Sequence, residues 1–164
     1  MSELTAERLR ELLDYCPRTG AFRWRKSRGG KIEGSVAGYS AKNGYLQLGV
    51  DKKLYLAHRL AWLYVYGEWP ARDVDHANGD RRDNRAANLR LASRSQNMQN
   101  QRRAHKDSKS GYLGVGLHAS GLWRASITID RTHTHLGYFK TPEEAHEAYI
   151  AAKTQLHPFS PTNS

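Results

Sequence analysis

The stretch from Asp73 to Asn100, DVDHANGDRRDNRAANLRLASRSQNMQN, constrains the fold more than any other part of the chain. A short apolar-flanked segment ends in the pair Asp75-His76, a polar loop follows, and residues 89–92 then have the character of a second strand. The polar run after it, which holds Asn97, is compatible with a helix. We therefore expect two strands folded over a loop and followed by a helix. A histidine beside a carboxylate, with an asparagine to orient it, is suited to activating water next to a metal-bound phosphate.

The overall charge points to a polyanionic partner. The 164 residues carry a net charge of +10, and the isoelectric point is about 9.9; phosphate backbones are the commonest partner of such proteins. The mean hydropathy of −0.78 and the lack of a long apolar run argue against a membrane span, and no signal peptide is visible. Cys16 is the single cysteine, which excludes an intrachain disulfide framework and a zinc ribbon. We expect a cytoplasmic location and a metal held by oxygen and nitrogen.

The region before this stretch predicts a small α/β layer. Residues 4–15 suggest an amphipathic helix capped by Thr5, and residues 58–66 a second helix stopped by Gly67 and Pro70. Between them the pattern predicts strands at 22–26, 35–37, 45–50 and 54–57, with a hairpin turn at 51–53. The basic face of the first strand either contacts phosphate or is solvated. His58 is either a structural group or a chemical one, and Arg59 is better suited to contact phosphate.

Residues 45–100 resemble the HNH endonuclease family, and most of all its homing-type members from phages and introns. The match consists of several motifs in order: His58-Arg59-Leu60, Gly67 with Pro70, Val74-Asp75-His76, Asn78-Gly79-Asp80, Asp83-Asn84-Arg85, Asn88-Leu89-Arg90 and Asn97. The spacing also fits, because Asn88 lies twelve residues after His76 and Asn97 nine residues after Asn88.

The resemblance implies a ββα-metal core, the His-Me finger, at about 72–103 within a domain of residues 1–100. His76 would be the general base, and Asn88 would hold its imidazole through a side-chain or backbone carbonyl. Asp75 and Asn97 would bind one divalent metal, most naturally Mg²⁺, with Mn²⁺ as an alternative and zinc excluded. Cleavage would leave a 3′-hydroxyl and a 5′-phosphate. Taken singly, each asparagine could equally be a turn, cap or exposed helix residue. A phage-encoded member would work in the bacterial host cytoplasm.

The remainder of the chain predicts a linker and a second domain. Residues 101–110 are basic, and Arg102 and Arg103 either follow phosphates or form a solvated charge run. Three strands are expected at 112–117, 122–129 and 134–139, with turns at 118–121 and 130–133 between them. Thr141 then begins a helix that covers one face of the sheet. A tail at 158–164 ends the chain.

Residues 111–157 resemble the ethylene-response-factor type of DNA-binding domain found in plant transcription factors. The resemblance rests on Tyr112-x-Gly114-Val115, Trp123-x-Ala125, Leu136-Gly137-x-Phe139 and Glu143-Glu144-Ala145-x-x-Ala148-Tyr149. It implies that the open sheet face lies in the major groove, where the matching positions include Gly116, His118, Arg124, Ser126, Thr128 and His135. The plant domains have several arginines and tryptophans on this face and this chain has only Arg124, so the sequence preference must differ.

Together these patterns predict an α+β protein that hydrolyses a phosphodiester bond in duplex DNA with the help of a metal. It would have a ββα-metal nuclease core and a C-terminal three-stranded antiparallel sheet packed on one helix. A non-catalytic, transcription-factor-like DNA-binding protein is the main alternative, and a basic structural or RNA-packaging protein is a third. The oligomeric state stays open; a monomer with one such centre would most simply nick one strand.

Overall fold

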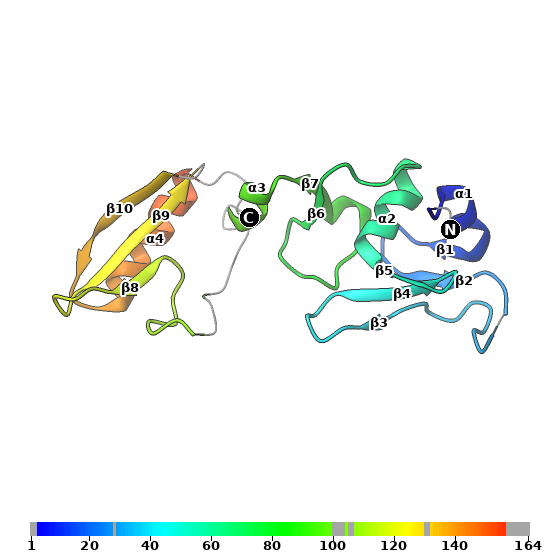
Figure 1. The fold of residues 1–164 in the computed structure, drawn as a ribbon, viewed down its shortest axis with the longest axis horizontal. Coiled ribbons are helices and arrows are strands. Elements are labelled where there is room, and N and C mark those ends of the chain that lie inside the picture. The colour runs from blue at the N-terminus through cyan, green and yellow to red at the C-terminus, as the bar shows by residue number, and fades with distance from the viewer. Residues whose placement is uncertain (1–2, 28, 100–103, 105–106, 130–131, 157–164) are drawn as a thin grey trace. The chain divides into compact units, whose positions relative to one another are not determined.

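The computed structural model describes residues 3–27, 29–99, 104, 107–129 and 132–156 (Figure 1). The chain divides into two compact units, Met1–Ala92 and Ser93–Ser164. The division falls earlier than the boundary expected at residue 100. Both units contain helices and strands, so the fold is of mixed α and β type.

The first unit opens with helix α1, Ala6–Leu12, whose first turn is capped by Thr5. The Thr5 hydroxyl accepts a hydrogen bond from the backbone N–H of Arg8 at 3.2 Å. The helix predicted over residues 4–15 was too long. Leu13 is extended, with φ −136° and ψ 142°, and β1, Leu13–Tyr15, pairs antiparallel with β2, Phe22–Trp24. In β1 the first and third residues are buried and the second is exposed, which is the strand period.

A second sheet lies beside this hairpin and consists of β3, Tyr39–Ser40, β4, Leu46–Val50, and β5, Lys53–Leu56. The strand expected at 35–37 is reduced to one bridge between Val36 and Arg23. Helix α2, Ala57–Tyr66, confirms the predicted second helix, and it ends at Gly67 with a positive φ of 83°. The buried side chains of this helix join the core formed with α1 and the strands.

The stretch that dominates the sequence folds into β6, Asp73–His76, paired antiparallel with β7, Leu89–Ala92. A short 3₁₀ helix, η1, Ala86–Asn88, precedes β7 and was not foreseen. Helix α3, Arg94–Gln99, follows β7 in the chain. Its start is a capping box, since Ser93 N–H donates to Gln96 Oε1 at 2.8 Å and Gln96 N–H donates to Ser93 Oγ at 3.2 Å.

The rest of the second unit is a sheet with strand order β10-β9-β8, packed against helix α4, Pro142–Leu156. The strands are β8, Val115–Leu117, β9, Trp123–Ile129, and β10, Thr132–Phe139. The first strand is shorter than expected, and β10 begins where the sequence suggested a turn. Ala125 and Ile127 of β9 are buried, whereas Arg124 and Thr128 are exposed, so the sheet has a covered and an open face.

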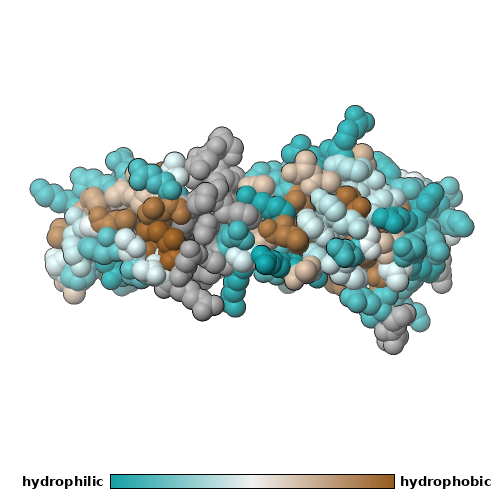
Figure 2. Space-filling view, turned by 90° about the horizontal axis from the view of Figure 1, so that it is seen from above, coloured by the Kyte–Doolittle hydropathy of each residue, from teal (hydrophilic) through white to brown (hydrophobic). Residues whose placement is uncertain are grey.

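The surface drawn in Figure 2 is mostly hydrophilic, with separate apolar patches. Among the residues that the structure describes, no helix is long and apolar enough to cross a membrane.

Candidate active site

Asp75 and His76 lie at the end of β6, where the antiparallel register places them opposite Arg90 and Leu89 of β7. Both side chains are buried, with 7% of Asp75 and 3% of His76 exposed. The strand pair therefore fixes the backbone of these two residues, while the loop from Ala77 to Asn88 determines what surrounds the imidazole.

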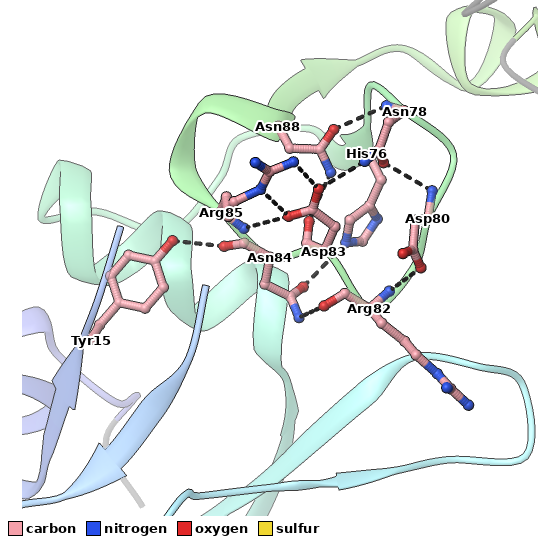
Figure 3. Close-up of polar contacts among 9 residues, drawn as sticks. All are labelled: Tyr15, His76, Asn78, Asp80, Arg82, Asp83, Asn84, Arg85 and Asn88. Carbon is pink, nitrogen blue, oxygen red and sulfur yellow. Dashed lines mark hydrogen bonds and ion pairs between the residues drawn. The ribbon is translucent and has the colours of Figure 1, made fainter. Parts of the chain in front are cut away.

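The loop is organised by side chains that hydrogen-bond to nearby backbone groups (Figure 3). Asn78 Oδ1 accepts from the N–H of Asp80 at 2.9 Å, and Asp80 Oδ1 accepts from the N–H of Arg82 at 2.9 Å. Asp83 forms a two-point ion pair with Arg85, at 2.7 and 2.6 Å. The hydrogen bonds from Arg85 are the main reason that the pKa of Asp83 is lowered to about 2. The loop thus keeps a rigid shape without a buried apolar cluster of its own.

Asn88 closes this loop at its base. Its Oδ1 accepts from the backbone N–H of Asn78 at 2.9 Å, and its Nδ2 donates to the carbonyl oxygen of Asp83 at 2.7 Å. Its own carbonyl accepts from the N–H of Ala77 at 2.8 Å. The sequence predicted that Asn88 would hold the imidazole. In the structure the hydrogen bonds of its carboxamide go to the loop backbone instead.

The carboxamide that meets the imidazole belongs to Asn84, a member of the Asp83-Asn84-Arg85 motif, for which the sequence indicated no role at the imidazole. Its Oδ1 lies 3.1 Å from His76 Nε2, and its side chain is fully buried. The only signal in the sequence was an asparagine eight residues after the histidine, and many loops contain such a residue.

The rings of His58, on α2, and Tyr45 also lie close to His76. The ring centroids of His58 and His76 are 5.0 Å apart in an edge-to-face arrangement, and Tyr45 lies 5.2 Å from His58 and 6.0 Å from His76. Burial lowers the pKa of His58 to about 3, with smaller contributions from His76 and Arg59. Burial also lowers the pKa of His76, partly opposed by its hydrogen bond to Asn84 and by nearby carboxylates. Both imidazoles are therefore neutral at pH 7, as a general base must be.

Comparison with known proteins gives a family match in this region. Residues 55–99 match the sequence model of the HNH endonuclease family. We refer to this stretch as the HNH segment. The homing endonuclease I-HmuI, from a structure describing its DNA binding and cleavage, is similar with 26% identity and a TM-score of 0.44. That similarity covers 55% of this chain and 51% of the other, so the chain spans about half the length of the solved structure that it matches. No curated protein matches the chain.

The two predicted metal ligands of the HNH segment have different surroundings. Asp75 Oδ2 accepts hydrogen bonds from Arg90 Nε at 3.1 Å and Arg90 Nη2 at 3.0 Å, so a guanidinium shares this carboxylate. Asn97 is exposed on α3, in the second unit. A carboxylate and a carboxamide are oxygen donors of the kind that a hard cation such as Mg²⁺ accepts. Within the described part of the chain, three or more histidine, cysteine, aspartate or glutamate side chains do not gather into a metal-binding group.

The predicted DNA contacts are distributed over both units. Arg59 of the HNH segment lies with its guanidinium 5.7 Å from the centre of the Trp69 ring and is partly exposed. Arg102 and Arg103 lie outside the described residues. In the second unit the predicted contacts share the open side of the sheet or its loops and are exposed or partly exposed: His118, Arg124, Ser126, Thr128 and His135.

The open sheet face also presents a residue that the sequence did not indicate. The β9–β10 register shifts between His135 and Gly137, and this bulge puts His135 and Tyr138 side by side although they are three residues apart. Their ring centroids are 4.6 Å apart, and the ring centroids of His118 and Tyr138 are 4.7 Å apart. Tyr138 is 48% exposed and lies opposite Arg124 in the register. The open sheet face therefore carries the Arg124 guanidinium together with the rings of His118, His135 and Tyr138.

Proposed function

We propose that this protein is a metal-dependent endonuclease of duplex DNA, with His76 as the general base. The proposal depends on one observation. His76, the last residue of β6 in the HNH segment, has a buried imidazole whose pKa is lowered. An imidazole that stays neutral at pH 7 can take a proton from the water that attacks a phosphorus atom.

The other residues of the segment would prepare the phosphate for this attack. Asp75 and Asn97 would hold one divalent cation, which when bound would neutralise charge developing on the phosphate and stabilise the leaving oxygen. Mg²⁺ suits the oxygen donors best, and Mn²⁺ could replace it. Arg90 would keep the Asp75 carboxylate oriented, since its two hydrogen bonds meet the same oxygen.

The C-terminal unit would hold the DNA through its open sheet face, in the manner of the ethylene-response-factor domain that its sequence resembles. Three features support this assignment. Arg124 is exposed on the central strand of the sheet, and Ser126 and Thr128 follow it on the same strand. Tyr138 lies opposite Arg124 in the register and has the rings of His118 and His135 close to its own. A nuclease site that contacts mainly the phosphate backbone needs such a second surface to set its register on the duplex.

A nicking assay on supercoiled plasmid tests the catalytic proposal. The wild type should cut with Mg²⁺ and not with EDTA. His76→Ala should lose cleavage while keeping its affinity for duplex DNA, measured by gel shift. Asp75→Ala should also lose cleavage, whereas Asp73→Ala, which removes an exposed carboxylate from the same strand, should cut like the wild type.

Two outcomes would contradict the proposal. If His76→Ala cuts at the parental rate, the imidazole is not the base. If the wild type binds DNA and does not cut with any divalent cation, the chain is a DNA-binding protein that carries an HNH segment without using it. If the enzyme is active, mapping the ends of cleaved random duplexes would report which strand it cuts and which sequence it prefers.

A further inference from the structure

We infer that Asn84 is the positioning residue of His76, and that the N-terminal hairpin β1–β2 holds Asn84 in place. The inference rests on the proposed function for its catalytic meaning, because a positioned imidazole matters only if His76 acts as the base. Its structural content stands on contacts within the first unit.

The orientation of the Asn84 carboxamide follows from its two hydrogen bonds. Asn84 Nδ2 donates to the carbonyl oxygen of Arg82 at 3.2 Å, and Oδ1 lies 3.1 Å from His76 Nε2 (Figure 3). Turning the amide over would place its oxygen against the Arg82 oxygen, two acceptors facing each other. The carboxamide oxygen therefore points to the imidazole, and Nε2 of His76 must carry the hydrogen. In the neutral ring the proton-accepting lone pair is then on Nδ1.

The backbone of Asn84 is held by residues far away in the sequence. The Tyr15 hydroxyl, at the end of β1, donates to the Asn84 carbonyl oxygen at 2.7 Å. Burial raises the pKa of Tyr15 to about 12, so this donor keeps its proton at physiological pH. Just beyond, the N–H of Ala86 donates to the carbonyl oxygen of Pro17 at 3.2 Å, which fixes the next part of the loop.

Gly20, in the turn of the same hairpin, allows this close approach. A Cβ at this position would lie 2.5 Å from the Asn84 carbonyl carbon and 2.6 Å from the Arg85 nitrogen. The backbone φ is +72°, a conformation that favours glycine. The turn thus packs backbone against backbone, and movement of the hairpin would be transmitted to Asn84. The β1–β2 hairpin therefore helps to orient the His76 imidazole through its contacts with Asn84.

The imidazole hydrogen gives a direct test. In ¹⁵N-labelled full-length protein at pH 7.5, His76 should show a proton on Nε2 that exchanges slowly with water, identified by its loss in His76→Ala. Asn84→Ala should lose this proton signal while the backbone amide spectrum remains that of a folded protein. Its kcat for plasmid nicking should fall about 10- to 100-fold, the usual effect of removing a group that orients a site residue. Its affinity for duplex DNA should be unchanged.

Variants of the hairpin test the second half of the inference. Tyr15→Phe removes one hydrogen bond and should lower kcat about fivefold, in line with about 1 kcal/mol for such a bond; Tyr66→Phe, an exposed ring, is its control. Gly20→Ala should broaden or shift the His76 signal. Gly30→Ala is matched to it, because Gly30 has a φ of +78° and an added Cβ would meet no atom of the described residues within 4 Å.

The outcomes separate this inference from the proposed function. A protected proton on Nδ1 instead of Nε2, or an Nε2 signal that persists in Asn84→Ala, would overturn the role of Asn84. An unchanged signal and kcat in both Tyr15→Phe and Gly20→Ala would overturn the role of the hairpin. If the His76 proton behaves as expected but His76→Ala still cleaves DNA, the positioning is correct and the proposed base is wrong.

Discussion

Lowering the pH from 7 to 5 should destabilise the first unit through His58. This imidazole is 5% exposed, its Nδ1 meets no hydrogen-bond partner among the residues that the structure describes, and burial lowers its pKa from 6.5 to about 3. Below pH 6.5 the His58 imidazole is protonated in the unfolded chain but not in the folded protein. The free energy of unfolding is therefore unaffected by His58 above pH 6.5 and decreases as the pH falls from 6.5 toward 3. At about 1.36 kcal/mol per pH unit, the loss from His58 reaches about 2 kcal/mol at pH 5.

His58→Phe should remove this pH dependence and keep the aromatic packing. The variant should be as stable as the wild type or more so at pH 7, because an unpaired buried nitrogen disappears. Urea unfolding followed by tryptophan fluorescence measures the effect, since Trp24, Trp62 and Trp69 lie in the first unit. Asp83, with a pKa of about 2, stays charged over this range. Exposed His133→Phe is the control.

If His58→Phe loses as much stability between pH 7 and pH 5 as the wild type, burial of the His58 imidazole does not cause the loss. In that case the imidazole either becomes protonated within the fold or is reached by water, and the cost assigned to its burial would be absent.

Two further predictions concern activity and binding. The pKa of His76 is lowered by burial, so the acid limb of the cleavage rate should be centred below pH 6.5; an acid limb centred at or above 6.5 would contradict this. Arg124→Ala should weaken duplex binding and reduce the slope of log K against log salt by about one, as expected for one lost phosphate contact. Arg8→Ala, an equal change of charge in the first unit, should leave that slope unchanged, and a gel-shift titration at several salt concentrations distinguishes the two.

The sequence predicted the elements whose pattern is local and missed those set by distant contacts. Helix α2 was predictable because its apolar spacing and the stop at Gly67 lie within a dozen residues. The end of α1 was not, because Leu13 and Tyr15 fit the apolar face of a helix as well as the buried face of a strand. Pairing with Phe22–Trp24 decides between the two, and helical periodicity gives no information on that partner. The bulge in β10 could not be predicted for the same reason, because the register shift before Gly137 depends on pairing with β9.

The candidate site shows the same difference between features set by local sequence and features set by distant contacts. Asp75 and His76 could be placed together because they are neighbours on one strand, and the order of the motifs after them indicated the chemistry. Which asparagine meets the imidazole depends on the path of the loop, and that path depends on Tyr15 and Gly20, more than sixty residues earlier. The family resemblance indicated Asn88 for this role, and in the structure the Asn88 carboxamide hydrogen-bonds to the loop backbone. Asn84 contacts the imidazole because the β1–β2 hairpin, which lies outside the HNH segment, packs against the Asn84 backbone. The geometry of the HNH segment therefore depends on residues that precede it in the chain.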